Sequence, residues 1–202
     1  MKIGPKFKIA KRLGAPIFEK TQTPQFARSE ARQGRVSKRR PGQMSDYKRQ
    51  LIEKQKMRFT YGITETQLRR YVNEALLKGD QPVLNLFSRL EQRLDNVVYR
   101  LGLAKTRQFA RQMVSHGHIL VNGKRMTIPS HKVKVNDVIT VREGSKQSAL
   151  FLNMEETHEE VAVPAWLSMD IKKLEGTSTG TPNYNPAETL FDPEQVFEFY
   201  SR

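Results

Sequence analysis

The amino-acid sequence predicts an α+β fold. A mostly helical N-terminal domain is followed by a small module of two helices packed on a short, mainly antiparallel sheet, and both ends are rich in loops. Three observations lead to this prediction. Apolar residues recur at the helical period of 3.6 between residues 47 and 114. From residue 117 onward, short apolar runs separated by turn residues replace that period. The two ends sustain neither pattern and are punctuated by prolines.

The N-terminal elements follow from turn residues and caps. Residues 1–44 contain four prolines and four glycines and are expected to form loops and short turns. Ser45 or Asp46 can cap a helix over residues 47–59. This helix is basic around most of its circumference, so it needs something other than a core to pack against. A capping box, Thr64 with the Gln three residues later, begins a helix that extends to about residue 77.

The middle of the chain changes from helices to strands. One helix is predicted over residues 83–101, and Thr106 caps a shorter one. Short strands follow at residues 119–121, 133–135 and 138–141. The first of them ends at Asn122-Gly123, which is typical of a type I′ hairpin turn. Together these elements make a compact α+β module.

The last part of the chain is acidic and looser. Residues 176–181 combine glycine, threonine and serine and are interpreted as a flexible loop. An apolar cluster over residues 196–200 is expected to dock onto the body of the protein, as such clusters at chain ends usually do. We therefore divide the chain into an N-terminal domain (1–85), a second domain (86–155) and an acidic C-terminal extension (156–202) whose last residues dock on the first domain.

The charge distribution points to a polyanionic partner. The net charge is +14 and the isoelectric point is about 10.1. Residues 1–60 hold 17 Lys and Arg against 4 acids, residues 61–150 hold 15 against 7, and residues 151–202 hold 3 against 10. The first two thirds are thus expected to face nucleic acid and the last third to face away from it. Membrane-surface binding is the alternative, but the basic N-terminal segment lacks an amphipathic helix of useful length.

Several classes of protein are excluded. The chain contains no cysteine, which removes disulfides, thiolate metal sites and cysteine nucleophiles. No uninterrupted apolar run approaches 18 residues, and the basic N-terminus lacks the apolar stretch of a signal peptide. We expect a soluble, cytoplasmic protein that has no membrane partner and forms no obligate homo-oligomer.

No catalytic constellation emerges, and we expect no enzyme activity, no cofactor and no metal. His116 and His118 could form a metal pair, but two imidazoles without a nearby carboxylate fall short of a site. Arg93-Leu94-Asp95 resembles the catalytic motif of RNA pseudouridine synthases. Because the triplet falls inside a predicted amphipathic helix, we expect Asp95 to make an ion pair or hydrogen bond within the domain instead.

Basic residues gather in patterns that suit a large folded RNA, recognised by its shape and phosphates, better than a DNA major groove. Three consecutive cations at 38–40 stand in a Gly/Pro loop, and others crowd the helix N-terminus near Thr106, which itself favours anions. The candidate RNA contacts are Lys6, Lys8, Lys11, Arg12, Lys38, Arg39, Arg40, Tyr47, Lys48, Arg49, Lys54, Lys56, Arg58, Arg69, Arg70, Arg93, Arg100, Lys105, Thr106, Arg107, Arg111, Gln112, His116, Asn122, Lys124 and Arg125.

The stretch over residues 89–143 closely resembles the S-four RNA-binding domain, which also occurs in tyrosyl-tRNA synthetases and pseudouridine synthases. The flanks are more specific. Residues 45–75 and the ending VFEFYSR resemble the bacterial-type ribosomal protein S-four family. The matching residues of the domain are Arg93, Leu94, Asp95, Val98, Arg100, Leu101, Gly102, Thr106, Arg107, Ala110, Arg111, Gln112, His116, Gly117, Val121, Asn122, Gly123 and Val138.

This resemblance implies a structural constituent of the small ribosomal subunit. Family members bind the 5′ domain of 16S ribosomal RNA directly and help to nucleate assembly. With the neighbouring proteins S-three and S-five they line the channel through which messenger RNA enters, and they influence translational accuracy. Many carry a four-cysteine zinc site near the N-terminus, which does not carry over to this chain. The alternative, an RNA-modifying or tRNA-charging enzyme, would need a further domain with a pocket, and the sequence offers none.

Overall fold

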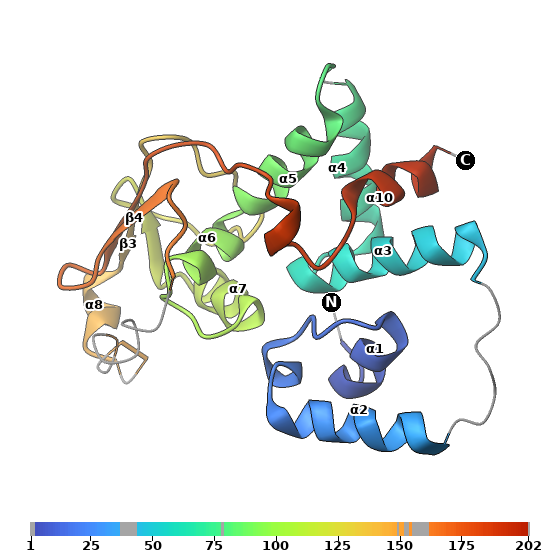
Figure 1. Ribbon diagram of the computed structural model, residues 1–202. Helices are drawn as coiled ribbons and strands as arrows, with labels where there is room; N and C mark the ends of the chain where they lie inside the picture. The colour runs from blue at the N-terminus through green and yellow to red at the C-terminus, as the bar shows by residue number, and fades with distance from the viewer. Residues whose placement is uncertain are drawn as a thin grey trace. The chain divides into compact units, whose positions relative to one another are not determined.

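Two sets of helices and strands, drawn from different parts of the chain, make up the computed structural model (Figure 1). It describes residues 3–36, 44–77, 79–148, 150–151, 154 and 162–201. Unit 1 consists of Met1–Val83 with Asn185–Arg202, and unit 2 of Leu84–Tyr184. Unit 1 contains α1 (Lys6–Leu13), η1 (Glu19–Thr21), α2 (Pro24–Val36), α3 (Asp46–Tyr61), α4 (Glu65–Leu77), η2 (Pro186–Glu188) and α10 (Pro193–Tyr200).

The N-terminal prolines and glycines border helices, so the expectation of loops and short turns over residues 1–44 is wrong for α1 and α2. Pro5 directly precedes α1, and Pro24 is the first residue of α2. At these positions a missing backbone N–H costs no helical hydrogen bond. Gly14 ends α1 in the left-handed conformation with a φ of 65°. A short helix thus forms between prolines and glycines whose number alone suggests loops.

Aromatic side chains hold these short helices together. Phe7 of α1 meets Phe26 of α2 edge-on, with ring centroids 5.4 Å apart. Phe18 meets Phe59 of α3 in the same way at 6.1 Å. Edge-to-face pairs contribute about 0.5–1.5 kcal/mol each beyond the burial of their area. The segment therefore has a small core of its own.

Helices α3 and α4 have the predicted ends. Ser45 caps α3, its hydroxyl accepting from the backbone N–H of Lys48 at 3.4 Å. Gly62 ends the helix with a φ of 61°. The Thr64 hydroxyl accepts from the backbone N–H of Gln67 at 3.4 Å, which is one half of the predicted capping box.

Helix α10 packs against α3, although the two are distant in sequence (Figure 1). Val196 of α10 is fully buried. The ring of Phe199 lies 5.7 Å from that of Tyr47, and Phe191, just before α10, lies 6.0 Å from Tyr61. The C-terminal segment thus supplies α3 with an apolar surface that its own sequence lacks.

The helix predicted over 83–101 is two helices, α5 (Pro82–Glu91) and α6 (Leu94–Arg100), so the single helix is a wrong prediction. The break falls at Arg93, whose φ and ψ of −68° and 136° are extended. The backbone N–H of Leu94 donates to the carbonyl of His131 at 2.9 Å, and that of Asp95 donates to Pro129 at 3.1 Å. The first backbone N–H groups of α6 therefore donate to carbonyls of a loop near the sheet. In one continuous helix they would donate to carbonyls of the preceding turn instead.

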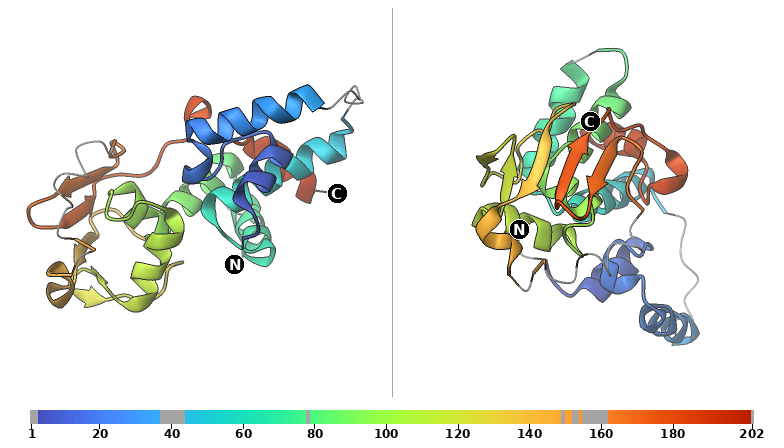
Figure 2. Two further views of the ribbon diagram at one scale, coloured as in Figure 1. Left: turned by 90° about the horizontal axis from the view of Figure 1, so that it is seen from below. Right: turned by 90° about the vertical axis from the view of Figure 1, so that its left-hand side faces the viewer.

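Unit 2 continues with α7 (Arg107–His116), the short α8 (Glu143–Lys146) and a five-stranded antiparallel sheet. The strand order is β2-β1-β3-β5-β4. Helices α6 and α7 cover one face of this sheet (Figure 2). The strands are β1 (Ile119–Val121), β2 (Lys124–Arg125), β3 (Val138–Val141), β4 (Leu167–Asp170) and β5 (Glu175–Ser178).

The turns of the sheet confirm one prediction and correct two. Asn122 and Gly123 both have positive φ, 50° and 76°, as a type I′ hairpin turn requires. Residues 133–135 form no strand; Val133 is buried in the core instead. Residues 175–178 form β5 between β3 and β4, so the first half of the predicted flexible loop, 176–178, is a strand. A Cβ on Gly176 would collide with the buried Leu101 side chain, so this glycine allows the close contact of strand and helix.

Candidate nucleic-acid interface

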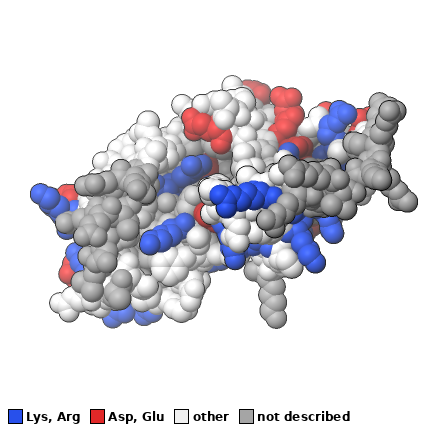
Figure 3. Space-filling model, turned by 60° about the horizontal axis from the view of Figure 1, so that its bottom comes forward, with Lys and Arg blue, Asp and Glu red and all other residues white. Residues whose placement is uncertain are grey.

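The exposed cations among the described residues of unit 1 come from α1, η1, α2, α3 and α4. They are Lys8, Arg12, Lys20, Arg28, Lys48, Arg49, Arg69 and Arg70. Of these, Arg49 pairs with Asp46 at 3.8 Å and Arg70 with Glu74 at 3.2 Å, and surface pairs of this kind are weak. Lys and Arg side chains project at many places on the face drawn in Figure 3.

Two cations of α1 act within the fold. Lys11 donates to the Ser29 carbonyl at 2.9 Å and to its hydroxyl at 2.7 Å, which ties α1 to α2. The Lys6 ammonium lies 5.6 Å from the centroid of the Phe18 ring. Both side chains are half-buried, so they support the surface on which Lys8 and Arg12 are presented.

The cations in the second half of α3 are engaged by the protein itself. Lys54 is only 6% exposed. Its ammonium donates to Glu65 at 2.8 Å and lies 4.2 Å from the centroid of the Phe199 ring. Lys56 pairs with Glu53 at 2.7 Å, and Arg58 lies 3.6 Å from Glu65. In this conformation the Lys54 ammonium is held inside unit 1, whereas the sequence suggested an RNA contact.

Glu65 is the acceptor that joins α3, α4 and α10. Burial alone would raise its pKa, but the hydrogen bonds from Lys54 and Tyr200 outweigh burial and hold the pKa of Glu65 below its ordinary value. The Tyr200 hydroxyl donates to Glu65 at 2.7 Å. Burial, and then this bond, raise the pKa of Tyr200. On the same side of α3, Gln50 donates to Glu198 at 2.8 Å.

Helix α7 presents the candidate residues of unit 2. The Thr106 hydroxyl accepts from the backbone N–H of Phe109 at 3.1 Å, which confirms the predicted cap. The N-terminus of a helix favours anions such as phosphate. Lys105, Gln112 and His116 are exposed on or beside this helix.

The β1–β2 hairpin adds to that surface. Lys124 and Arg125 are exposed, and Arg125 donates to the His116 carbonyl at 3.2 Å. Asn122 has a structural role, since its amide donates to Asp137 at 2.8 Å and accepts from the backbone N–H of Val138 at 2.9 Å. The hairpin is thus tied both to the end of α7 and to the start of β3.

Arg93, a candidate RNA contact from the sequence, lies in the interior of unit 2. It is 1% exposed and donates to both oxygens of Asp95, at 3.0 and 2.8 Å. The predicted ion pair of Asp95 is confirmed. Arg111 of α7 donates to the same carboxylate at 2.8 and 2.6 Å, and its side chain is 29% exposed. One buried carboxylate therefore links the start of α6 to α7, and Arg111 is structural as well as partly accessible.

A second buried carboxylate extends this network. Glu91, 1% exposed, accepts from Asn96 at 2.9 Å and from Arg100 at 3.0 and 3.1 Å. Asn96 in turn accepts from Arg107 at 2.8 Å, while the Arg107 guanidinium lies 4.4 Å from the centroid of the Tyr99 ring. Since buried charges are stable only when they are paired, the network fixes how these arginines lie.

Sequence reasoning missed Glu91 and Asn96. Both are polar residues next to the apolar stripe of their helices, Glu91 after Leu90 and Asn96 before Val97. A charged or amide side chain beside core positions, near several arginines, is the signal that could have identified them.

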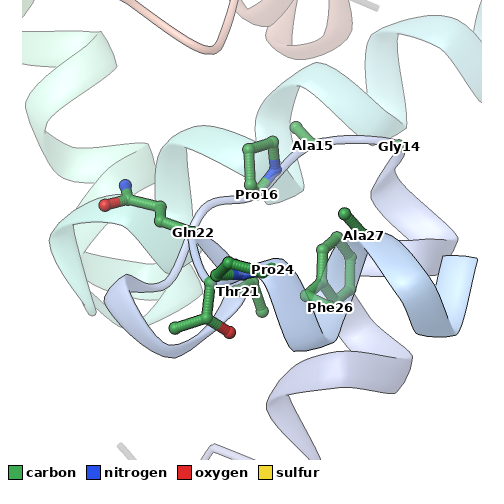
Figure 4. Close-up of a pocket in the computed structure, with 9 residues that line it drawn as sticks. Gly14, Ala15, Pro16, Thr21, Gln22, Pro24, Phe26 and Ala27 are labelled. Carbon is green, nitrogen blue, oxygen red and sulfur yellow. The ribbon is translucent and has the colours of Figure 1, made fainter.

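The remaining candidates and cavities complete the survey of the described residues. Lys38, Arg39 and Arg40 lie outside them. Within the described part of the chain, no helix is both long and apolar enough to cross a bilayer. A cavity of about 520 Å³ opens beside η1 and is lined largely by small and apolar residues, among them Pro16, Pro24 and Phe26 (Figure 4). None of the described residues that line it has a charged side chain.

Comparison with known proteins covers almost the whole chain. Residues 1–91 match the ribosomal protein S4/S9 N-terminal domain and residues 92–139 match the S4 domain. The small ribosomal subunit protein uS4 of Chromobacterium violaceum is 42% identical over 203 residues, which cover 99% of this chain and 98% of that protein. The protein of the same name from Chloroflexus aurantiacus is 43% identical over 204 residues, 99% and 98% of the two chains. That from Streptococcus thermophilus is 43% identical over 201 residues, 98% and 97%. The chain belongs to the uS4 family of ribosomal proteins.

Proposed function

We propose that this protein is a primary binder of 16S ribosomal RNA that attaches to the 5′ domain and helps to nucleate assembly of the small subunit. As a member of a ribosomal protein family it is a structural, RNA-binding component and not an enzyme. The proposed binding to 16S ribosomal RNA and the role in assembly rest on one observation. Exposed cations remain on both units after the cations in internal ion pairs are set aside.

The two sets of exposed cations suit separate stretches of one folded RNA. In unit 1 they lie on α1, η1, α2, α3 and α4. In unit 2 they include Lys105 beside α7 and Lys124 and Arg125 on the β1–β2 hairpin, which we propose as the RNA contacts of that unit. Phosphate contacts fix the position of a protein on RNA without reading its sequence. A protein that holds two stretches of RNA at once restricts how they fold, which is the physical basis for a role early in assembly.

A second part of the proposal concerns neighbours in the subunit. The family resemblance favours contacts with S-three and S-five and a contribution to the channel through which messenger RNA enters, and hence to accuracy. The acidic C-terminal residues support protein neighbours, since phosphate would repel them. The cations at 38–40 are candidates for either ribosomal or messenger RNA, and we favour ribosomal RNA because a static partner gives a reason for three adjacent charges.

Binding to a transcript of the 16S 5′ domain tests the main proposal. The double variant Lys105→Ala/Lys124→Ala removes two exposed cations from the proposed surface of unit 2. The matched control, Lys172→Ala/Lys173→Ala, removes two exposed cations at the β4–β5 turn. We expect the first to weaken binding about ten-fold or more and the control to change it little. Equal losses would show that only total charge matters, and would contradict the proposed surface.

A further inference from the structure

A buried carboxylate of unit 2 holds a partly accessible guanidinium in one orientation. Glu91, the last residue of α5, is buried, whereas the side chain of Arg100, the last residue of α6, is 33% exposed. Arg100 donates from Nε and Nη2 to the two oxygens of Glu91, at 3.0 and 3.1 Å. Two parallel hydrogen bonds fix both the distance and the direction of the planar guanidinium group. Arg100 therefore reaches the surface without being able to turn.

Asn96 extends the same constraint to a second arginine. Its amide nitrogen donates to the Glu91 carboxylate at 2.9 Å and to the Glu91 backbone carbonyl at 3.0 Å. Carboxylate and carbonyl oxygens only accept, so the amide nitrogen must face Glu91 and the amide oxygen must face away from it. That oxygen accepts from Nε of Arg107 at 2.8 Å. Glu91 thus sets the direction of Arg107 through Asn96.

Tyr99 holds Arg107 from a second side. The centre of the Arg107 guanidinium lies 4.4 Å from the centroid of the Tyr99 ring, and both side chains are half-buried. The guanidinium is therefore held along one edge by an amide oxygen and over a ring by cation–π attraction. A side chain that is already held in place loses less conformational entropy when it binds a partner.

The wider network carries more positive than negative charge. Two buried carboxylates, Glu91 and Asp95, accept directly or through Asn96 from four arginines. The arginines are Arg93, Arg100, Arg107 and Arg111. Of these four, Arg93 alone is buried, and the other three are half-buried. Four positive charges against two negative ones favour an anion at the surface that the three accessible arginines share.

We propose that Glu91 and Asn96 are positioning residues for RNA, which hold Arg100 and Arg107 in the directions in which they meet backbone phosphates. This inference rests on the proposed function. Glu91 and Asn96 are 1% and 2% exposed, so neither touches RNA and both act through the arginines. Phosphate is the ligand because guanidinium groups match its oxygens in geometry and charge.

Replacing the carboxylate of Glu91 separates positioning from charge. The variant Glu91→Gln raises the net charge by one, so charge alone would strengthen binding to RNA. The proposal predicts weaker binding, because the new NH₂ group cannot accept a hydrogen bond from Arg100. The matched control is Glu143→Gln, which removes a carboxylate of the same unit whose side chain is 86% exposed.

Replacing the amide of Asn96 tests the second link without changing any charge. Asn96→Leu keeps a similar shape but removes the acceptor for Arg107. If Asn96 acts through Arg107, its replacement matters while Arg107 is present and not after Arg107→Met. The four proteins of this double-mutant cycle isolate the coupling between the two residues. A merely structural role would cause the same loss in both backgrounds.

The experiment measures affinity for a 16S 5′-domain transcript at several salt concentrations, at a temperature at which thermal unfolding shows each variant to be folded. We expect Glu91→Gln and Asn96→Leu each to weaken binding about three-fold or more, because a released arginine must be ordered again on binding. Glu143→Gln should bind as tightly as the unaltered protein or more tightly. Arg107→Met should lower the salt slope by about one. Asn96→Leu keeps the test decisive if Glu91→Gln does not fold.

Three results would overturn the assignment while leaving the proposed function intact. The first is equal or tighter binding by Glu91→Gln, which would show that the carboxylate only reduces the positive charge. The second is an equal loss from Asn96→Leu with and without Arg107. The third is an unchanged salt slope for Arg107→Met, which would show that this arginine meets no phosphate. Failure of the unaltered protein to bind the transcript would overturn the proposed function and this inference together.

Discussion

The two basic helices of the molecule, α3 in unit 1 and α7 in unit 2, use their cations differently. On α3, Lys54 is neutralised by Glu65 of the next helix and is covered by aromatic residues from the C-terminal end of the chain. On α7, Arg111 is held by Asp95, a carboxylate buried in the same small domain. In both helices, cations that composition assigns to RNA form ion pairs within the fold. We therefore expect fewer RNA contacts than the number of basic residues suggests.

The largest expected effect is the loss of stability when Asp95, a buried carboxylate of unit 2, is replaced. Asp95→Ala leaves Arg93 buried without its main partner and releases Arg111. We expect the free energy of unfolding to fall by about 3–5 kcal/mol, because an uncompensated buried charge is costly. Urea denaturation measures this. Arg111→Ala is the matched comparison, with a smaller loss because Asp95 keeps Arg93. A loss below about 1 kcal/mol for Asp95→Ala would contradict the structural role.

The next effect concerns the C-terminal helix of unit 1. Deleting residues 192–202 removes Val196, which is fully buried, and the ring of Phe199 over Lys54. Burial of Val196 alone contributes about 1.5–3 kcal/mol. We expect a lower melting temperature together with near-normal affinity for RNA at temperatures where the variant is folded. Unchanged stability with lost RNA affinity would mean that the segment acts at the interface instead.

A smaller effect on stability is expected at low pH. The pKa of Glu65 is lowered in the folded protein, so this group stabilises the fold above its ordinary pKa of 4.5. That contribution is lost as the pH falls through the lower folded pKa. Glu65→Gln should therefore narrow the difference in melting temperature between pH 7 and pH 3. If the variant shows the original dependence on pH, other carboxylates account for it.

The smallest expected effect is that of metal removal. The N-terminal helices are held by the Phe7–Phe26 and Phe18–Phe59 ring contacts and by Lys11. Thermal unfolding should thus be the same with and without a strong chelator, whereas Phe26→Ala should lower the melting temperature. If the chelator lowered the melting temperature, a bound metal would be needed for stability in addition to these contacts, which would contradict the prediction.

The sequence predicted local features of the fold well and distant pairings poorly. The caps at Ser45 and Thr106 and the turn at Asn122-Gly123 depend on neighbouring residues, and the structure confirms them. The break between α5 and α6 depends on carbonyl acceptors in residues 129–131, and β5 depends on pairing with β3 and β4. No periodicity within either segment indicates such partners.

The candidate site shows the same division. Exposure of Lys48 and burial of Lys54 differ because α10 packs on one side of α3, and nothing near residue 54 in the sequence indicates α10. The pairing of Asp95 was predictable because its helix is amphipathic, whereas its two arginine partners come from the turn before α6 and from α7.

The most direct test compares Lys48→Met with Lys54→Met on the same helix. The two variants remove equal charge from positions six residues apart, one exposed and one buried. The measurement is the slope of log affinity for a 16S 5′-domain transcript against log salt concentration. We predict that Lys48→Met lowers the slope by about one, while Lys54→Met leaves it unchanged. An equal reduction by Lys54→Met in a variant that remains folded would show that α3 releases α10 to bind RNA, and would contradict the account.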